Sequence, residues 1–416
     1  METIENIAKS AKNAFLTTMS LSDATKNEAI KNIIKKIKEK ESEIFEANEK
    51  DLKEAQKLLE EGKINKPAYD RLKLDKNKLQ SLIQGLEDLI KLKDPVNCVL
   101  WEKELDKGLI LKKVSTPIGV IGVIFESRPD CFIQIASLII KSGNCAILKG
   151  GSEAINTNSI FSKIVDEALD ETEGFDKNAI NLVYSREDIK KLLELDNYLS
   201  LIIPRGSNSL VKFIKENTKI PVLGHASGIC HIFVDKTADL NNSISIITDA
   251  KTQYPSACNA VETLLIHKDF SEIEKLKSAL IEKGIKIIEN PDNYSIEYGD
   301  KILALKIVDN IDCAINHINK YGSGHTDSIL SNDKSSIECF FNLVDSSSVL
   351  SNCSTRFSDG FRYGFGAEVG ISTNKTHARG PVGLEGLTIY KYKLEGSNNI
   401  VLDYVEGKKT FTHRVL

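Results

Sequence analysis

The sequence lacks the features that would mark a metalloprotein, a secreted protein or a membrane protein. Its eight cysteines form no C-x-x-C pair. Cys230 and His231, the only adjacent cysteine and histidine, would point in different directions along a strand. We therefore expect free thiols in a reducing compartment and no metal site. No run of about 18 or more apolar residues occurs, so no transmembrane helix is predicted.

The sequence also has no marked excess of either charge. Lysine and arginine total 55 and aspartate and glutamate total 59, for a net charge of -4. This balance gives no reason to expect nucleic acid or a membrane as a partner. Residues 1–20 carry both signs of charge and no apolar core. We therefore expect no signal peptide and a cytoplasmic location.

Two phosphate-binding motifs, G-x-G-x-x-G and G-x-x-x-x-G-K-[ST], are absent as well. What is present is an alternation of strand-like and helix-like segments, which predicts α/β domains with parallel sheets. The first ninety or so residues are expected to be helical. The strands of a first sheet are expected to run from residues 119–125 to residues 231–234. A second set begins near Thr252 and predicts a second α/β domain.

Polar loops that contain glycine follow several predicted strands, at residues 125–130, 148–153 and 204–208. In open parallel sheets, ligands bind beyond the carboxyl ends of the strands, so this placement favours a nucleotide or anion site. A glycine pair after a strand is equally typical of a tight turn.

Three cations in these loops are candidate ligand-binding residues. Lys149 directly follows a predicted buried strand and could reach a ribose hydroxyl or a phosphate, although a solvated surface lysine is the alternative. Arg128 and Arg205 could each grip a carboxylate or a phosphate through two hydrogen bonds. Either arginine alone is more often a salt-bridge partner.

Cys258 is the best nucleophile candidate among the cysteines. Most cysteines are small buried hydrophobic residues, and the apolar sequence around Cys145, Cys230 and Cys313 fits that pattern. Cys258 instead lies among the polar, turn-forming residues 253–259, a context that suits a reactive thiol.

The last third of the chain contains segments dense in glycine and polar residues, at 321–327, 354–360 and 377–381. Such loops are either mobile surface or the lining of a site, and composition does not decide between the two. His225 and His325 are either proton carriers or structural residues.

Several of these segments are recognisable, among them TPIGVIGVIFESRPD (116–130), AILKGGSEAINTN (146–158), CNAVETLLIH (258–267) and the long segment 344–387. The sequence resembles the γ-glutamyl phosphate reductases, or glutamate-5-semialdehyde dehydrogenases, of the aldehyde dehydrogenase superfamily. The likeness covers nearly the whole chain in order. The form GHASGICH (224–231) resembles the variant that plants fuse to a glutamate kinase. The chain contains no kinase region, so a stand-alone reductase is expected, with a glutamate 5-kinase as an associated enzyme.

The resemblance implies an α/β fold of the aldehyde dehydrogenase type with three parts. A Rossmann-type cofactor-binding domain would comprise residues 1–100 and 116–250, and residues 251–380 would form an α/β catalytic domain. Residues 101–115 and 381–416 would form a small β oligomerisation element, so that a homo-oligomer is expected.

The resemblance also implies where NADPH would bind. Lys149 and Ser152 would meet the adenosine ribose, Gly206 and Ser207 the pyrophosphate, and Glu297 the nicotinamide ribose. Relatives that prefer NAD often carry a glutamate where Ser152 stands. A carboxylate there would repel the 2′-phosphate and a hydroxyl would donate to it, so NADPH is favoured as the cofactor.

For the chemistry, the resemblance implies that Cys258 attacks L-glutamyl 5-phosphate, forms a thioester and releases phosphate, after which hydride transfer gives glutamate 5-semialdehyde in proline biosynthesis. The backbone N–H of Cys258 would hold the oxyanion together with Arg128 or Asn259. The phosphate and the α-carboxylate of the substrate would bind arginines, and the candidates are Arg205, Arg356 and Arg379.

One departure from ordinary aldehyde dehydrogenases is informative. Their general-base glutamate corresponds to about Val222-Leu223, where no carboxylate stands. An enzyme that hydrolyses its thioester needs that base, and a reductase does not. Three alternatives remain open: an oxidising aldehyde dehydrogenase, a cysteine acyltransferase or hydrolase without nicotinamide, and a nucleotide-binding regulatory protein.

Overall fold

The computed structural model describes residues 3–126, 128–224 and 227–416. The chain begins with helices, as expected, and their apolar stripes face the core. In α2, for example, Ile30, Ile33 and Ile37 are fully buried, and the side chain of Ser22 caps the helix by accepting from Thr25 N. The five N-terminal helices are α1 (Ile4–Thr18), α2 (Asp23–Glu39), α3 (Glu41–Glu60), α4 (Lys66–Leu72) and α5 (Lys76–Lys91).

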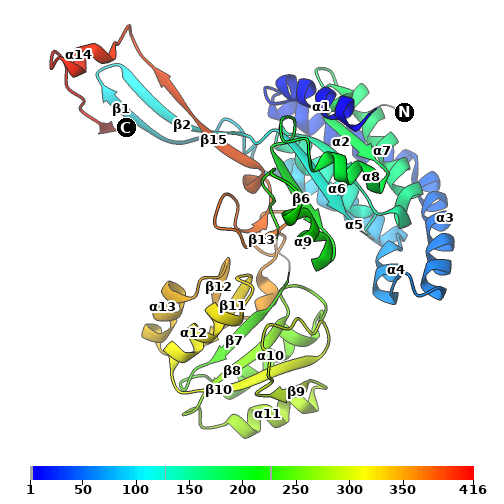
Figure 1. Ribbon diagram of the computed structural model, residues 1–416, viewed down its shortest axis with the longest axis vertical. Helices are drawn as coiled ribbons and strands as arrows, with labels where there is room; N and C mark the ends of the chain where they lie inside the picture. The colour runs from blue at the N-terminus through cyan, green and yellow to red at the C-terminus, as the bar shows by residue number, and fades with distance from the viewer. Residues whose placement is uncertain (1–2, 127, 225–226) are drawn as a thin grey trace.

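A parallel four-stranded sheet follows, with strand order β5-β4-β3-β6. Its strands are nearly continuous apolar runs because helices cover them (Figure 1). The elements of this first lobe are β3 (Val120–Phe125), α6 (Asp130–Lys141), β4 (Cys145–Lys149), α7 (Ile155–Asp170), β5 (Ile180–Val183), α8 (Arg186–Leu192), β6 (Leu201–Arg205) and α9 (Asn208–Glu216). The strands β3, β4 and β6 end at Phe125, Lys149 and Arg205, so the three predicted loops meet at one edge of the sheet.

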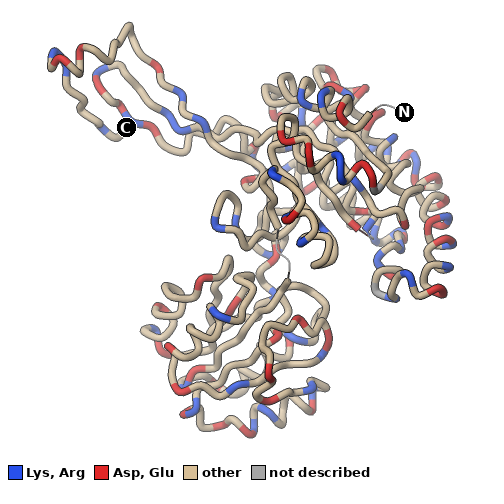
Figure 2. Tube along the Cα trace, viewed as in Figure 1, with Lys and Arg blue, Asp and Glu red and all other residues tan. Residues whose placement is uncertain are grey.

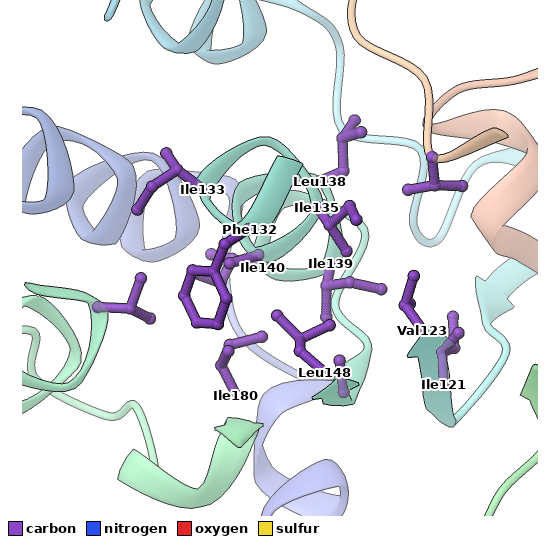
Figure 3. Packing of buried hydrophobic residues seen from close by; sticks show 14 of the residues in the cluster. Ile121, Val123, Phe132, Ile133, Ile135, Leu138, Ile139, Ile140, Leu148 and Ile180 are labelled. Carbon is purple, nitrogen blue, oxygen red and sulfur yellow. The ribbon is translucent and has the colours of Figure 1, made fainter. Parts of the chain in front are cut away.

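Helix α6 forms the centre of the first core. Figure 3 shows Phe132, Ile135 and Ile139 of this helix among side chains from β3, β4 and β5. Nearly every residue of α6 is buried, since the sheet packs on one side and N-terminal helices pack on the other. This packing fixes the strand ends that carry the site.

A second parallel sheet has six strands in the order β12-β11-β7-β8-β10-β9. The predicted strand at residues 231–234 belongs to this sheet and not to the first one, so its assignment was wrong. An apolar strand of this length suits either sheet, and the periodicity of the sequence does not say which. The elements of this second lobe are β7 (Cys230–Val234), α10 (Leu240–Thr252), β8 (Val261–His267), α11 (Ile273–Glu282), β9 (Lys286–Glu289), β10 (Ile302–Val308), α12 (Ile311–Tyr321), β11 (Thr326–Leu330), α13 (Lys334–Leu343) and β12 (Ser348–Ser351).

The change of sheet therefore falls between β6 and β7, earlier than the predicted boundary at 250/251. The chain also leaves the second lobe before residue 380. Strands β13 (Gly370–Ser372) and β14 (Gly380–Val382) form a small ribbon, and Val369, Val382 and Leu387 join the core of the first lobe. The ribbon lies between the two sheets in Figure 1.

An antiparallel sheet with the order β15-β2-β1-β16 extends away from both lobes as an arm (Figure 1). Its strands were expected, but a short helix in the tail was not. The elements of the arm are β1 (Val99–Asp106), β2 (Leu109–Pro117), β15 (Thr388–Glu395), α14 (Val401–Val405) and β16 (Arg414–Val415). The resemblance implied a β element at residues 101–115 and 381–416, and the strands of the arm lie within residues 99–117 and 388–415.

Charges of both signs alternate along the outer helices of the first lobe, as Figure 2 shows for α3 and α4. Within the described parts of the chain, no helix is both long enough and apolar enough to cross a membrane.

Candidate active site

A cavity of about 1050 Å³ lies where the carboxyl edge of the first sheet faces the second lobe. It brings together residues that are far apart in the sequence, from the loops after β3, β4 and β6 and from the loop before β8. Ten of the eleven predicted site residues line it: Arg128, Lys149, Ser152, Arg205, Gly206, Ser207, Cys258, Asn259, Glu297 and Arg356.

Arg379, the eleventh, does not line this cavity. Its guanidinium donates to the carbonyl oxygen of Asp345 at 2.9 Å and to the Asp345 carboxylate at 3.0 Å. The structure therefore gives Arg379 a role in holding a loop. His325 is fully buried, and its Nδ1 lies 2.7 Å from Oγ1 of Thr326, which favours the structural reading. His225 lies outside the described residues.

Cys258 lies in a tight loop between α10 and β8. The loop folds back through successive turns, in which Ala257 N donates to Tyr254 O at 3.1 Å and Ala260 N donates to Ala257 O at 2.9 Å. Gly228 packs directly against it, since a methyl group added there would lie 2.1 Å from the carbonyl oxygen of Cys258. Only glycine allows this approach, so the position of Cys258 depends on it.

Two neighbours tie the Cys258 loop to the segment after β12. Nδ2 of Asn259 donates to Ser358 O at 2.8 Å, and this buried amide therefore holds the backbone of that segment. Nε of Arg356 donates to Gln253 Oε1 at 2.9 Å, and its guanidinium lies over the ring of Tyr254. Burial lowers the pKa of Arg356, and electrostatic attraction to Cys258 opposes this shift. A cation therefore stands close to the thiol.

The part of the cavity where the sequence predicts nucleotide binding is built on the ends of β4 and β6. Lys149 is only 6% exposed, so the alternative of a solvated surface lysine is wrong. Gly206 precedes α9, and a methyl group there would lie 2.4 Å from Oε2 of Glu126. That same Glu126 oxygen accepts from Ser207 N at 2.9 Å, so a carboxylate already sits at the positive end of α9. A pyrophosphate fits such a glycine-bearing helix start.

The turn after Lys149 holds two residues that bear on the choice of cofactor. Ser152 is exposed at the start of a short 3₁₀ helix, Ser152–Ala154. The Glu153 carboxylate folds back over Gly151, where a methyl group would lie 2.1 Å from its Oε1. The Ser152 hydroxyl is therefore exposed beside the Glu153 carboxylate in this turn.

Several lining residues were not predicted. Lys63 reaches the cavity from the turn after α3, Arg71 from α4, and Cys131 from the first turn of α6, where burial raises the pKa of its thiol. Their sequence context is that of ordinary helices and a turn between two of them. Only the packing of α3 against the Ser152 turn brings the first two to the site. Nothing in the local sequence could have identified them.

The region that replaces the usual general base is apolar in the structure as well. Val222 pairs with Ile202 beside the first sheet, and Leu223 is buried. Two carboxylates that line the cavity are engaged with backbone: Asp359 accepts from Phe361 N, and Glu368 accepts from Gly360 N. Neither Val222 nor Leu223 therefore offers a carboxylate that could act as a base.

Comparisons with known proteins agree with this arrangement. The sequence model of the aldehyde dehydrogenase family matches residues 1–299 of this chain. A γ-glutamyl phosphate reductase of Brachyspira hyodysenteriae is 56% identical, over 98% of this chain and 98% of that protein. The chain belongs to the γ-glutamyl phosphate reductase family. It is an oxidoreductase with the aldehyde dehydrogenase fold.

Solved structures support the same conclusion. The crystal structure of the Thermotoga maritima γ-glutamyl phosphate reductase superposes with a TM-score of 0.92 at 37% identity, over 96% of this chain and 100% of that one. The glyceraldehyde-3-phosphate dehydrogenase of Methanocaldococcus jannaschii, solved in complex with NADP, has a TM-score of 0.68 at 15% identity, over 95% of this chain and 94% of that one. The second likeness bears on the fold alone.

Proposed function

We propose that this enzyme reduces L-glutamyl 5-phosphate to L-glutamate 5-semialdehyde and phosphate with NADPH, through a thioester on Cys258, in proline biosynthesis. The observation that carries the proposal is one cavity that joins a half-buried cysteine, four arginines and glycine-bearing loops at strand ends, with apolar residues in place of the general base. The names of its relatives supply the substrate.

The residues of the first lobe fit NADPH. Lys149 and Ser152 would contact the adenosine ribose with its 2′-phosphate, and the amide groups at Gly206 and Ser207 would receive the pyrophosphate once the Glu126 carboxylate moves away. Glu297, whose Oε2 accepts from Asn208 Nδ2 at 3.5 Å across the cavity, would meet the nicotinamide ribose. When bound, the cofactor supplies the hydride.

In the proposed first step, the Cys258 sulfur forms a bond to the acyl carbon while the bond from that carbon to the phosphate oxygen breaks. Negative charge develops on the carbonyl oxygen during attack, and the backbone N–H of Cys258 and the guanidinium of Arg128 are its proposed donors. The guanidiniums of Arg205 and Arg356 would hold the phosphate and the α-carboxylate of the substrate. Asn259, already bonded to Ser358, would serve to place the loop.

The thioester must survive until hydride arrives, so water must not attack it. The apolar pair Val222-Leu223 provides no carboxylate that could activate water, and Asp359 and Glu368 accept backbone hydrogen bonds. Phosphate is then the nucleophile that reverses the reaction. An oxidising aldehyde dehydrogenase would require a base at this position.

The reverse reaction provides the test, since the acyl phosphate is labile. Purified enzyme is mixed with glutamate 5-semialdehyde, phosphate and NADP, and NADPH is followed by absorbance, with Cys258→Ala as control. We expect a phosphate-dependent signal that disappears in the variant. NADP binding without any such signal in the wild-type enzyme would point to a nucleotide-binding regulatory protein. No NADP binding would point to a cysteine acyltransferase or hydrolase.

A further inference from the structure

A buried ion pair lies beneath the active site, outside the residues that line the cavity. Lys251, at the end of α10, donates from Nζ to Oε2 of Glu262 at 2.8 Å, and both side chains are fully buried. Glu262 is the second residue of β8, four residues after Cys258. Burial raises the pKa of the Glu262 carboxyl and lowers that of the Lys251 ammonium, and their mutual attraction opposes both shifts.

The Glu262 carboxylate also holds a second segment of backbone. Tyr298 N donates to Oε2 at 3.2 Å and Gly299 N donates to Oε1 at 3.4 Å. The chain wraps around the carboxylate there, and Gly299 takes a positive φ of 63° that favours glycine. A charge-assisted acceptor is stronger than a neutral one, so two adjacent amide groups are pinned at this point.

Those two amides directly follow Glu297, which lies in a segment without regular structure between β9 and β10. The other end of the segment is anchored by Tyr294, whose ring contacts those of His317 and Tyr321. Glu297 therefore lies between two held points of the segment: the packed ring of Tyr294 and the two amide groups that donate to Glu262.

We propose that Lys251 and Glu262 are positioning residues for the cofactor, because their ion pair fixes the Glu297 segment relative to the strand that follows Cys258. Hydride transfer requires the nicotinamide to lie at a set distance from the thioester. Glu297 would hold the nicotinamide and Cys258 would carry the thioester, and the Glu262 carboxylate connects the two segments that bear these residues. A buried ion pair is weak support for stability, since apolar residues of similar size often replace it without loss. A role in positioning accounts for its location beside the site. The inference rests on the proposed function, in which Glu297 meets the nicotinamide ribose.

The test measures NADPH binding directly, by fluorescence titration of the full-length protein. The double variant Lys251→Met with Glu262→Gln removes both charges and leaves no buried charge without its partner. We expect its Kd for NADPH to rise about tenfold, the effect of a lost charge-assisted hydrogen bond. Alkylation of Cys258 by iodoacetamide is expected to keep its wild-type rate. Glu297→Gln should raise the Kd for NADPH by a similar factor. Combining all three substitutions should raise this Kd no further.

Two further variants keep the result interpretable. Leu276→Ala truncates a buried residue of α11 in the same lobe, and it should lower the melting temperature without changing the Kd. Gly299→Ala strains the turn around Glu262 without meeting any neighbour, so it reports on the same contact if the double variant fails to fold.

The NADPH affinities of these variants can overturn the inference. A wild-type Kd in the double variant or in Gly299→Ala would overturn the inference, as would losses that multiply with Glu297→Gln. If the wild-type enzyme gives no phosphate-dependent reaction or does not bind NADPH, the proposed function is wrong. That result comes from the wild-type protein alone, so it is distinguishable from a failure of the inference, which the variants show.

Discussion

At the scale of single residues, Gly228 fixes the position of Cys258, the proposed nucleophile. A methyl group at Gly228 would overlap the carbonyl oxygen of Cys258, so Gly228→Ala must displace the nucleophile. A shift of about 1 Å is enough to lower kcat by about a hundredfold. Steady-state kinetics measures this loss. Gly85→Ala is the control, since no atom lies within 4 Å of the added methyl in α5, and it should leave kcat unchanged.

A second prediction at this scale concerns His317, whose pKa is lowered to about 3 by burial and by the charges of His231, Lys306 and Lys320. The ring is only 5% exposed, against the rings of Tyr294 and Tyr321. In the unfolded chain this histidine takes up a proton near pH 6.5, and in the folded protein it stays neutral. The stability that it contributes is therefore complete above pH 6.5 and falls as the pH drops towards 3.

The slope should be about 1.4 kcal/mol per pH unit below pH 6.5. Urea unfolding between pH 7.5 and pH 5 measures it. His317→Gln should lower stability at pH 7.5, and its pH slope should be shallower than that of the wild type by this amount. Equal slopes would show that His317 is not the group responsible.

At the scale of elements, we propose that the turn of Ser152–Ala154 decides between the two nicotinamide cofactors. Ser152→Glu places a carboxylate where the 2′-phosphate is expected, and repulsion between the two should lower kcat/KM for NADPH about tenfold or more relative to NADH. Ser245→Glu adds the same charge at an exposed position of α10, away from the cavity. An unchanged NADPH-to-NADH ratio in Ser152→Glu would place the 2′-phosphate elsewhere.

Most elements could be predicted from sequence because each has its own local signal. The apolar stripe of α2 and the unbroken run of β3 are examples. Sheet membership has no such signal, and β7 was placed in the wrong sheet for that reason. Site residues next to strand ends, such as Lys149 and Arg205, could be predicted. Arg71 could not, because a tertiary contact alone brings its helix to the cavity.

At the scale of the whole molecule, the arm leaves apolar side chains in solvent. On β15, Tyr390, Tyr392 and Leu394 share one face and are 44%, 57% and 56% exposed. Such a patch on a projecting sheet is typical of a subunit interface, and we propose that it joins copies of this chain. Tyr392→Asp with Leu394→Asp should then lower the mass measured by sedimentation to that of a smaller assembly.

Lys393→Asp is the matched control for this prediction. It lies between the two substituted residues and faces the other side of the strand, so it should leave the assembly intact. An unchanged mass in the double variant would mean that the exposed face of β15 is not part of the interface.

In the proposed mechanism, phosphate attacks the thioester on Cys258 and water does not. The most direct measurement mixes the enzyme with glutamate 5-semialdehyde and NADP, without phosphate, and counts the NADPH formed. We predict a burst of about one NADPH per active site that then stops, because the acyl-enzyme cannot be hydrolysed without a general base. Added phosphate should start turnover. Continued NADPH formation without phosphate would contradict the account and identify an oxidising dehydrogenase that uses water.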